Sequence, residues 1–305
     1  MSYRKLAVFC TTILSLVFFS CNSSFEEIGG IEKDRSDSPE RPPLEKATLM
    51  NISYGSHPLQ KYDIYLPFNR NAEKTKVIIL VHGGGWIEGD KESMTPFIEL
   101  IKEHHPDHAI VNMNYVLAEI GPSFVPAFPN QFQDIGRVIN QIIEAKSEYQ
   151  ILPQFGMIGT SAGAHLSLMY DFVYDTEDQV KFVVDIVGPT DFTDPFYTED
   201  PNFNLALSVF VDESQYPQGT NYAEAVSPVY NVRSSSSPVA LFYGDEDPLV
   251  PLSNGIVLDE VLTDFGIEHN LTVYQGGHGD DWSTDDLEDI QEQINQFIDL
   301  HLPVN

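Results

Sequence analysis

The pattern of hydrophobic and polar positions predicts alternating strands and helices over most of the chain. Residues 48–54 and 60–66 alternate apolar and polar positions, as half-exposed antiparallel strands do. Residues 77–81 form a continuous apolar run, which is typical of a central strand covered on both faces. Five further strands are predicted at residues 109–115, 155–158, 182–187, 238–243 and 271–274.

Helices are expected where apolar residues recur every three or four positions. They are predicted at residues 93–104, 132–143, 162–174, 252–265 and 287–297. Ser93 is the expected cap of the first of these helices. Strands and helices in this alternation predict an α/β fold, with a mostly parallel central sheet and helices on both faces.

Residues 190–237 interrupt the alternation. They combine Pro, Asp and Ser with many aromatic residues, and they carry one short helical pattern at 205–210. We expect an insertion that packs over one end of the sheet. Because substrate pockets are mostly apolar, some of its aromatic residues should line one. These residues are Phe192, Phe196, Tyr197, Phe203, Phe210, Tyr216 and Tyr222.

The first 20 residues resemble an export signal. A basic start precedes an apolar run at 6–19, which is too short for a comfortable transmembrane helix. The run ends in Ser20-Cys21, and a small residue before a cysteine at this place resembles the lipoprotein signal of bacteria. Cys21 would then be the lipidated N-terminus of an exported protein, periplasmic or at the cell surface. Ordinary cleavage nearby is the alternative.

Three parts are therefore expected: a signal peptide at 1–20, a flexible tether at 21–43 and one folded domain at 44–305. The tether is rich in Ser, Glu, Asp and Pro, and it has too few apolar residues to bury a core.

The chain has only two cysteines, Cys10 and Cys21, so no disulfide framework and no Cys/His zinc site is expected in the folded domain.

The net charge excludes one class of partner. Lys and Arg number 16 and Asp and Glu number 46, which gives a net charge of −30. A nucleic-acid binder needs a basic surface that displaces counterions from phosphates, so no nucleic acid is expected as a partner. An anionic membrane surface repels the chain for the same reason, which leaves a lipid on Cys21 as the expected membrane contact.

A nucleophile motif lies between a predicted strand and a predicted helix. The sequence Gly159-Thr160-Ser161-Ala162-Gly163 follows the strand that ends at residue 158. A G-x-S-x-G motif at such a junction forms a sharp turn that exposes its serine. The N-terminus of the following helix favours negative charge that develops there. Ser161 is therefore the candidate nucleophile.

Consecutive glycines follow the strand that ends at residue 81, in the sequence His82-Gly83-Gly84-Gly85-Trp86. Glycines leave backbone amides unshielded, and such amides can stabilise an oxyanion opposite the nucleophile. A phosphate-binding loop would need a Lys-Ser/Thr pair that is absent here. We interpret His82 as a residue that orients this loop by hydrogen bonding, and not as the catalytic base.

Two later loops supply an acid and a base. Asp247 follows the strand at 238–243, and His278 follows the strand that ends near 274. An imidazole takes the proton of a nucleophilic serine, and a carboxylate orients the imidazole. The carboxyl ends of parallel strands meet at one edge of the sheet, so these loops should meet there too. Asp245 and Asp191 are the alternative acids.

With these motifs, the chain resembles an α/β-hydrolase, and more narrowly the HGGGW-bearing esterases near the hormone-sensitive-lipase and acetyl-esterase branch. The resemblance covers about residues 48–302. It is carried by HGGGW and the Gly89-Asp90-Lys91 that follows, by Asn112-Met113-Asn114-Tyr115, and by residues 159–165 and 244–251. Thr160 stands where the stricter pattern often has Asp, which moves the resemblance toward acetyl-esterase, feruloyl-esterase and formamidase-like members.

The resemblance implies hydrolysis of carboxylic esters through an acyl-enzyme, with neither cofactor nor metal. It assigns Ser161 as nucleophile, Asp247 as acid and His278 as base. It places the oxyanion hole at the amides of Gly83 or Gly84 and of Ala162. A lipid-tethered esterase suggests a small-molecule or glycan-linked ester, such as acetyl or feruloyl groups on a polysaccharide. An arylformamidase-like amide hydrolase and an inactive binding lipoprotein remain alternatives.

Other polar residues have simpler interpretations. We expect the histidines at positions 104, 105 and 108 to form a solvated connection and not a metal site, since Pro106 breaks the helix between them. His165 should support the helix that follows the nucleophile. The acidic run at 280–289 should begin a helix, where negative charge is favourable.

Overall fold

The computed structural model describes residues 43–119, 121 and 124–304 of the 305-residue chain. The signal peptide expected at 1–20, Cys21 and all but the last residue of the expected tether lie outside the described residues. Within those ranges, no helix has both the length and the apolar content that a membrane crossing requires.

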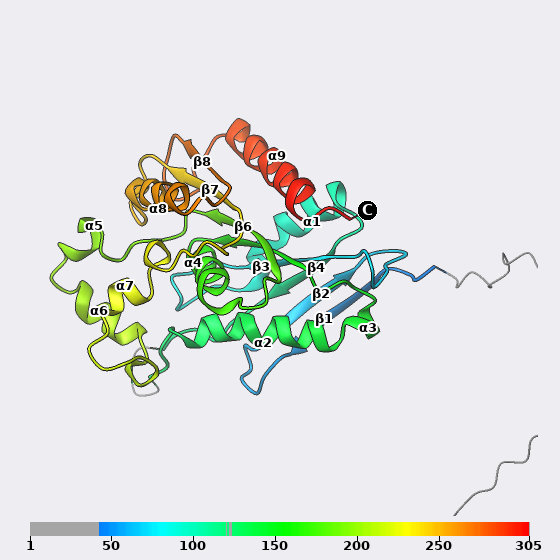
Figure 1. The fold of residues 1–305 in the computed structure, drawn as a ribbon, viewed down its shortest axis with the longest axis horizontal. Helices are drawn as coiled ribbons and strands as arrows, with labels where there is room; N and C mark the ends of the chain where they lie inside the picture. The colour runs from blue at the N-terminus through cyan, green and yellow to red at the C-terminus, as the bar shows by residue number, and fades with distance from the viewer. Residues whose placement is uncertain (1–42, 120, 122–123, 305) are drawn as a thin grey trace, which may run out of the picture. The chain divides into compact units, whose positions relative to one another are not determined.

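The described residues form one sheet of eight strands in the order β1-β2-β4-β3-β5-β6-β7-β8 (Figure 1). The strands are β1 Ala47–Ser53, β2 Lys61–Leu66, β3 Val77–Val81, β4 Ala109–Met113, β5 Phe155–Thr160, β6 Val180–Ile186, β7 Val239–Gly244 and β8 His269–Tyr274. β2 runs antiparallel to both of its neighbours, β1 and β4, and the remaining pairs are parallel. The prediction of a mostly parallel sheet that begins with two antiparallel strands is confirmed.

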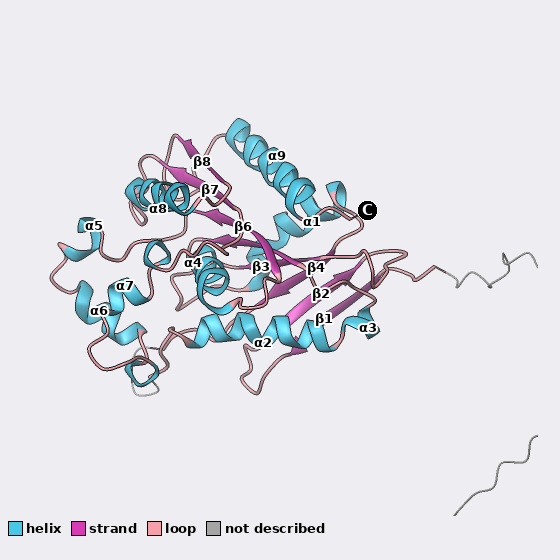
Figure 2. Ribbon diagram, viewed as in Figure 1, coloured by secondary structure: helices cyan, strands magenta, loops and turns pink. Residues whose placement is uncertain are grey.

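Helices cover both faces of this sheet (Figure 2). They are α1 Thr95–His104, α2 Asn130–Glu144, α3 Lys146–Tyr149, α4 Ala162–Met169, α5 Pro195–Thr198, α6 Phe203–Phe210, α7 Tyr222–Ala225, α8 Leu252–Phe265 and α9 Thr284–His301. Short helical turns lie at η1 Lys91–Met94, η2 Tyr170–Tyr174, η3 Glu213–Gln215 and η4 Pro228–Tyr230.

The central strand β3 shows how the two faces are filled. Ile78 and Leu80 pack in one core with α1 and α9, whereas Val77, Ile79 and Val81 pack in the other core with α2, α4 and α8. Side chains alternate between the faces of a strand, so a strand covered by helices on both sides must be apolar at every position. All five of these residues are fully buried, as the continuous apolar run predicts.

Two helices differ from their predicted form. Ser93 is not the cap of α1, because the side chain of Asp90 accepts a hydrogen bond from the Glu92 amide and starts η1 before α1 begins. The single helix predicted at 162–174 is instead α4 followed by one π-helical turn, η2. The acidic start of α9 is as expected, with a capping box between Ser283 and Asp286.

The expectation that the histidines at 104, 105 and 108 are solvated holds for His104, which is exposed, and is wrong for His105 and His108. His105 and His108 are buried, because the chain turns at Pro106 and directs both rings toward the end of α9. His105 Nε2 lies 3.0 Å from Asn295 Oδ1, and His108 Nε2 lies 2.8 Å from the Leu302 carbonyl oxygen. The two rings therefore hold α1 against α9. In the described part of the chain, no group of three or more His, Cys, Asp and Glu residues could hold a metal ion.

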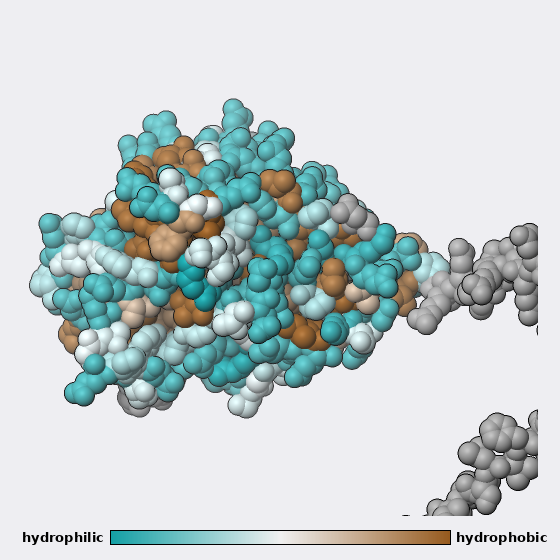
Figure 3. Space-filling view, in the orientation of Figure 1, coloured by the Kyte–Doolittle hydropathy of each residue, from teal (hydrophilic) through white to brown (hydrophobic). Residues whose placement is uncertain are grey.

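The insertion at 190–237 carries α5, α6, α7, η3 and η4. It is tied to α8 through Asn254, whose side-chain oxygen accepts hydrogen bonds from the amides of Thr190 and Asp191. Phe192 and Phe210 of the insertion pack against the Trp86 indole at centroid distances of 5.8 and 5.7 Å. The insertion thus lies over the glycine loop that follows β3, and hydrophobic residues gather over the neighbouring α8 (Figure 3).

Candidate active site

The serine of the nucleophile motif occupies a strained turn between β5 and α4. Ser161 has φ 50° and ψ −119°, a backbone conformation that is uncommon for residues other than glycine. Its amide donates to the Ile186 carbonyl over 2.7 Å, and its own carbonyl accepts from the amides of Ala164 and His165. These hydrogen bonds fix the turn on both sides, so the position of the Ser161 side chain is set by the strand and the helix.

The two glycines of the motif make this turn sterically feasible. A Cβ atom at Gly159 would lie 2.5 Å from Ala164 Cα, and one at Gly163 would lie 2.1 Å from the Val81 carbonyl oxygen. Neither distance is tolerable for a methyl group against backbone. Glycine at these positions therefore lets α4 cross closely over the ends of β5 and β3.

The structure brings the three predicted catalytic side chains together. His278 Nε2 lies 2.9 Å from Ser161 Oγ, and His278 Nδ1 lies 2.6 Å from Asp247 Oδ2. The second carboxylate oxygen of Asp247 accepts hydrogen bonds from the amides of Leu249 and Val250, at 2.8 and 3.0 Å. The side chain of Asp247 is fully buried, whereas that of His278 is 19% exposed.

Hydrogen bonding keeps Asp247 ionised in this buried position. Burial raises the pKa of its carboxyl group, but the hydrogen bonds from His278 and from the Val250 and Leu249 amides outweigh that effect and leave the pKa below its usual value. A carboxylate only accepts hydrogen bonds, so Nδ1 of His278 must carry the proton. Nε2 then presents its lone pair to the Ser161 hydroxyl.

The two alternative acids have local partners. Asp245 Oδ1 accepts a hydrogen bond from the Gly276 amide, at 3.0 Å. Asp191 Oδ1 accepts from the amide and the hydroxyl of Thr193. Each carboxylate thus stabilises its own loop, and Asp247 is the acid that bonds to His278.

The glycine loop, residues 82–86, lies directly against Ser161. A Cβ atom at Gly83 would lie 3.3 Å from Ser161 Cβ, so only a glycine backbone fits there without displacement. Gly84 has φ 115°, and its carbonyl accepts hydrogen bonds from the amides of Ile87 and Glu88, which closes a tight turn. Ala162 begins α4, where the amide has no acceptor within the helix. Of the predicted oxyanion residues, Ala162 follows Ser161 directly, Gly83 lies against it and Gly84 is the next residue of the glycine loop.

His82 supports this loop from behind. Its Nδ1 atom lies 2.6 Å from the Gly83 carbonyl oxygen, and its ring stacks on Tyr115 with a centroid distance of 4.3 Å. The Tyr115 hydroxyl donates to the His82 carbonyl over 3.0 Å. This placement agrees with the interpretation of His82 as a loop-orienting residue.

A buried ion pair holds the far end of the loop. Lys91 Nζ lies 2.8 Å from Asp63 Oδ2, and the two side chains are 6% and 3% exposed. Asn114 accepts from the Lys91 amide and donates to Asp90, while Asn112 donates to the Lys91 carbonyl. Asp63 was not predicted as a site residue, because the strand at 60–66 alternates polar and apolar positions and Asp63 occupies one of the polar ones.

Two apolar pockets lie beside the predicted catalytic residues, and both are lined in part by Ser161 and His278. The first, of about 470 Å³, lies between α1 and α9, and we call it the helix pocket. Its apolar lining includes Phe97, Leu100, Ile186, Val187, Trp282 and Leu287. The second, of about 550 Å³, lies under the insertion, and we call it the aromatic pocket. Its lining includes Trp86, Phe192, Tyr197, Phe203, Phe210 and Leu249.

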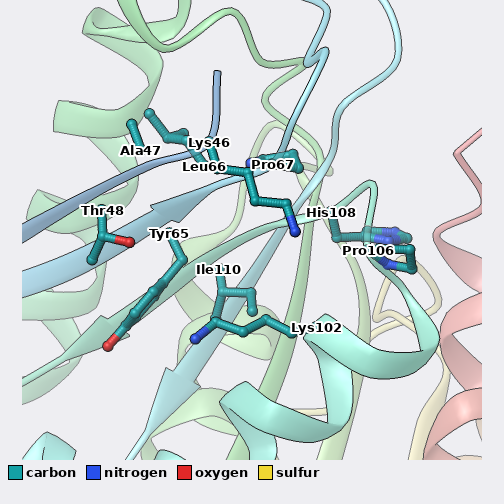
Figure 4. A pocket seen from close by; sticks show the side chains of 10 residues that line it. All are labelled: Lys46, Ala47, Thr48, Tyr65, Leu66, Pro67, Lys102, Pro106, His108 and Ile110. Carbon is teal, nitrogen blue, oxygen red and sulfur yellow. The ribbon is translucent and has the colours of Figure 1, made fainter. Parts of the chain in front are cut away.

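A smaller pocket of about 110 Å³ lies beside β2, with none of the predicted catalytic residues in its lining (Figure 4). Its walls include Tyr65 of β2 and Lys102 of α1, and Lys102 Nζ lies 4.5 Å from the centre of the Tyr65 ring. The contact between this cation and the ring accounts for the arrangement of these side chains. Ser161 therefore lines the helix pocket and the aromatic pocket but not this smaller pocket.

Comparison with known proteins identifies related chains. The isoprenylcysteine alpha-carbonyl methylesterase of Arabidopsis thaliana is 24% identical over 246 residues, which are 76% of this chain and 56% of that protein. The chain thus spans about half the length of this relative. An esterase of the planctomycete Thermogutta terrifontis superimposes with a TM-score of 0.66 at 20% identity, over 83% of this chain and 92% of that one.

A truncated carbohydrate esterase from gut microbiota also has this fold, with a TM-score of 0.61 at 19% identity, over 82% of this chain and 95% of that one. The BD-FAE family matches residues 62–262, which is well over half of the chain. The matched region runs from β2 to α8 and contains the glycine loop, Ser161 and Asp247. The chain therefore belongs to the BD-FAE family of α/β-hydrolases.

Proposed function

We propose that this protein is a serine hydrolase that cleaves carboxylic esters through an acyl-enzyme. The observation that carries the proposal is the continuous hydrogen-bonded chain from Ser161 Oγ to His278 Nε2 and from His278 Nδ1 to Asp247 Oδ2. Such a chain converts a weakly nucleophilic hydroxyl into an effective nucleophile. The neighbouring glycine loop supplies amides next to the position where the carbonyl oxygen becomes negative.

The reaction follows from this arrangement. His278 takes the Ser161 proton through Nε2 as Oγ attacks the ester carbonyl carbon, and the amides of the glycine loop and of Ala162 stabilise the resulting oxyanion. The imidazolium then gives its proton to the leaving alcohol, which leaves an acyl group on Ser161. A water molecule enters, His278 removes its proton, and collapse of the second tetrahedral intermediate releases the carboxylic acid and restores the serine.

The preferred substrates in this proposal are small acyl esters, including acetyl or feruloyl esters on glycans. The aromatic pocket supports this class, because its aromatic side chains can enclose a planar acyl or aryl group. The similarity in fold to a carbohydrate esterase agrees with a glycan-linked substrate. An arylformamidase-like activity would use the same three residues, and N-formylkynurenine distinguishes it from ester hydrolysis.

The test compares the wild-type chain with Ser161→Ala. We expect a fluorophosphonate probe to label the wild type and not the variant. The substrates would be p-nitrophenyl esters of increasing acyl length, acetylated xylan, methyl ferulate and N-formylkynurenine. Hydrolysis of esters by Ser161→Ala at the wild-type rate would refute the assignment of the nucleophile. Clear preference for long acyl chains would refute the proposed substrate class.

We further propose that the chain is exported and held at the membrane by a lipid on Cys21, because Cys21 directly follows Ser20 at the end of the apolar run. Detergent phase partition of cell extracts tests this. Cys21→Ser should move the protein from the detergent phase to the aqueous phase, whereas Cys10→Ser, a matched control within the expected signal, should not. Equal partition of the two variants would refute the anchor.

A further inference from the structure

His278 lies in a turn that consists mostly of glycine. Gly276 and Gly277 precede it and Gly279 follows it, and we call residues 276–279 the histidine turn. Gly276 has φ 133° and Gly279 has φ 93°, conformations that residues with a side chain rarely adopt. Glycine has more conformational freedom than any other residue, so a turn of this composition places an imidazole accurately only when other groups hold its backbone.

The carboxylate of Asp281 holds this backbone directly before His278. Asp281 Oδ1 accepts a hydrogen bond from the Gly277 amide, over 2.8 Å, and this is the only hydrogen bond of that amide to a described residue. Gly277 is buried, where a backbone amide without an acceptor is costly. A Cβ atom at Gly276 would lie 2.9 Å from the same carboxylate oxygen, so Asp281 lies closely over the turn.

The position of Asp281 is itself fixed by the residues that follow it. The Trp282 ring is buried and packs on Tyr274, at the end of β8, with a centroid distance of 4.9 Å. Ser283 then caps α9. The hydrogen bond from Gly277 to Asp281 therefore connects the flexible histidine turn to a part of the chain that is held by the core and by a helix.

The loop that carries Asp247 holds the histidine turn from the other side. Hydrogen bonds from this loop reach both the amide and the carbonyl group of Gly276, at 3.0 and 2.9 Å. The Asp247 carboxylate orients the imidazole through Nδ1 of His278. None of these bonds reaches Gly277, so Asp281 is the contact that fixes the backbone immediately before the base.

We propose that Asp281 is a positioning residue, which keeps His278 within reach of Ser161 by bonding to the Gly277 amide. The inference rests on the proposed esterase function. His278 Nε2 lies 2.9 Å from Ser161 Oγ, and a displacement of about 1 Å in such a pair can cost about a hundredfold in rate. Without the bond to Asp281, the histidine turn samples conformations in which the imidazole does not reach the serine.

The experiment measures kcat and KM for p-nitrophenyl acetate with the purified wild type and three variants. Asp281→Ala removes the acceptor of the Gly277 amide. Asp281→Asn keeps an oxygen that can accept this hydrogen bond and removes only the negative charge. Asp280→Ala is the matched control, because it removes the same charge from the adjacent, exposed position.

We expect Asp281→Ala to lower kcat at least about tenfold and to change KM by less than about twofold, because Asp281 acts on the base and not on the substrate. Asp281→Asn should keep at least about half of the wild-type kcat, and Asp280→Ala should match the wild type. An unchanged kcat in Asp281→Ala, or a change in KM alone, would overturn the proposal. Equal losses in Asp281→Asn or in Asp280→Ala would overturn it too, since they would trace the effect to charge.

Fluorophosphonate labelling of Ser161 separates this proposal from the proposed function. A wild type that is not labelled would contradict the serine-hydrolase assignment itself. Asp281→Ala should be labelled completely but more slowly than the wild type, because the probe reacts with the same activated hydroxyl. Wild-type labelling and turnover together with an unchanged labelling rate in Asp281→Ala would overturn only the role of Asp281.

Thermal unfolding shows whether the loss of activity reflects a loss of the fold. Asp281 is exposed, and its removal leaves the two hydrophobic cores intact. We expect the unfolding temperature of Asp281→Ala to fall by about 2–6 °C, so that the variant is folded in the assay at 25 °C. A variant that is unfolded at 25 °C would overturn the positioning role, because its low kcat would then follow from global instability.

Discussion

The indole of Trp86 donates a hydrogen bond to the imidazole of His165 over 3.2 Å and so joins the glycine loop to the helix behind the nucleophile. His165 Nε2 lies 2.7 Å from the Val226 carbonyl oxygen in the insertion. Nδ1 of His165 accepts the hydrogen bond from the indole N–H, so the hydrogen of the imidazole is on Nε2 and the ring is neutral. One buried side chain thus connects the glycine loop, α4 and the insertion.

This arrangement predicts a pH-dependent contribution to stability. Burial lowers the pKa of His165 to about 4, against the hydrogen bond to Val226, from an ordinary value of 6.5. Between about pH 6.5 and pH 4 the unfolded chain therefore binds a proton that the folded chain refuses. The contribution of His165 to stability is present above pH 6.5 and is lost as the pH falls through this window.

We expect His165→Phe to lower the free energy of unfolding at pH 7 by about 1–3 kcal/mol, since it leaves the Trp86 donor and the Val226 acceptor unpaired. Between pH 6.5 and pH 4 the free energy of unfolding of the variant should also fall less steeply than that of the wild type, because the variant lacks the titrating imidazole. Urea denaturation at a series of pH values measures both effects. Parallel stability curves for the two proteins would show that His165 does not titrate in this way.

The buried carboxyl group of Asp185 makes folding stability depend on pH in the opposite direction. Its carboxylate accepts hydrogen bonds from the Gly188 amide and the Tyr243 hydroxyl, but burial dominates and raises its pKa from 3.8 to about 7. Between about pH 4 and pH 7 the folded chain keeps a proton that the unfolded chain releases, so stability falls as the pH rises. The slope from one such group is at most about 1.4 kcal/mol per pH unit.

Asp185→Asn should remove this slope and raise the free energy of unfolding at pH 7 relative to the wild type. The amide oxygen can still accept from Gly188, and the amide nitrogen can donate to the Tyr243 hydroxyl, which itself donates to the Gly188 carbonyl. Denaturant unfolding from pH 5 to pH 8 provides the measurement. The pKa of Asp171 is also raised by burial, so the stability of the Asp185→Asn variant should still fall to some extent as the pH rises.

Asp247→Asn should abolish most of the activity with little effect on the fold. An amide in place of the carboxylate no longer requires His278 to carry its proton on Nδ1, so the tautomer that accepts the Ser161 proton is lost. We expect kcat to fall by about 10⁴-fold. Asp245→Asn is the matched control, and a loss of similar size in that variant would assign the acid to Asp245.

The ion pair between Lys91 and Asp63 makes a prediction about coupling. Lys91→Met leaves the Asp63 carboxylate buried without its partner, and we expect it to lower the free energy of unfolding by about 3–5 kcal/mol. The double variant Lys91→Met, Asp63→Asn should recover most of this loss, because neither remaining side chain carries a buried charge. A double variant as unstable as Lys91→Met would show that packing, and not charge, holds this end of the glycine loop.

The sequence predicted the parts of the site that depend on local order along the chain. Ser161, Asp247 and His278 each follow a strand whose apolar pattern is clear, and parallel strands bring their carboxyl ends together. The short helices of the insertion were largely missed, because α5 and α7 have four residues each and cannot show a helical period.

The contacts that were missed join residues far apart in the sequence. His108 was expected to be solvated because Pro106 breaks the helix before it, but its ring bonds to the carbonyl oxygen of Leu302, which lies 194 positions away. Trp86 and His165 are 79 positions apart, and no pattern within either segment indicates the other.

The insertion leaves the sheet after β6 and returns before β7, and none of the three predicted catalytic side chains comes from it. Two hydrogen bonds attach it to the rest of the domain: its Thr190 amide donates to Asn254 of α8, and its Val226 carbonyl accepts from His165 of α4. Under the proposed function, we expect a different insertion between the same two strands to change which esters are accepted and to leave Ser161, Asp247 and His278 in place. Evolution and protein engineering can thus vary selectivity and catalysis in this chain separately.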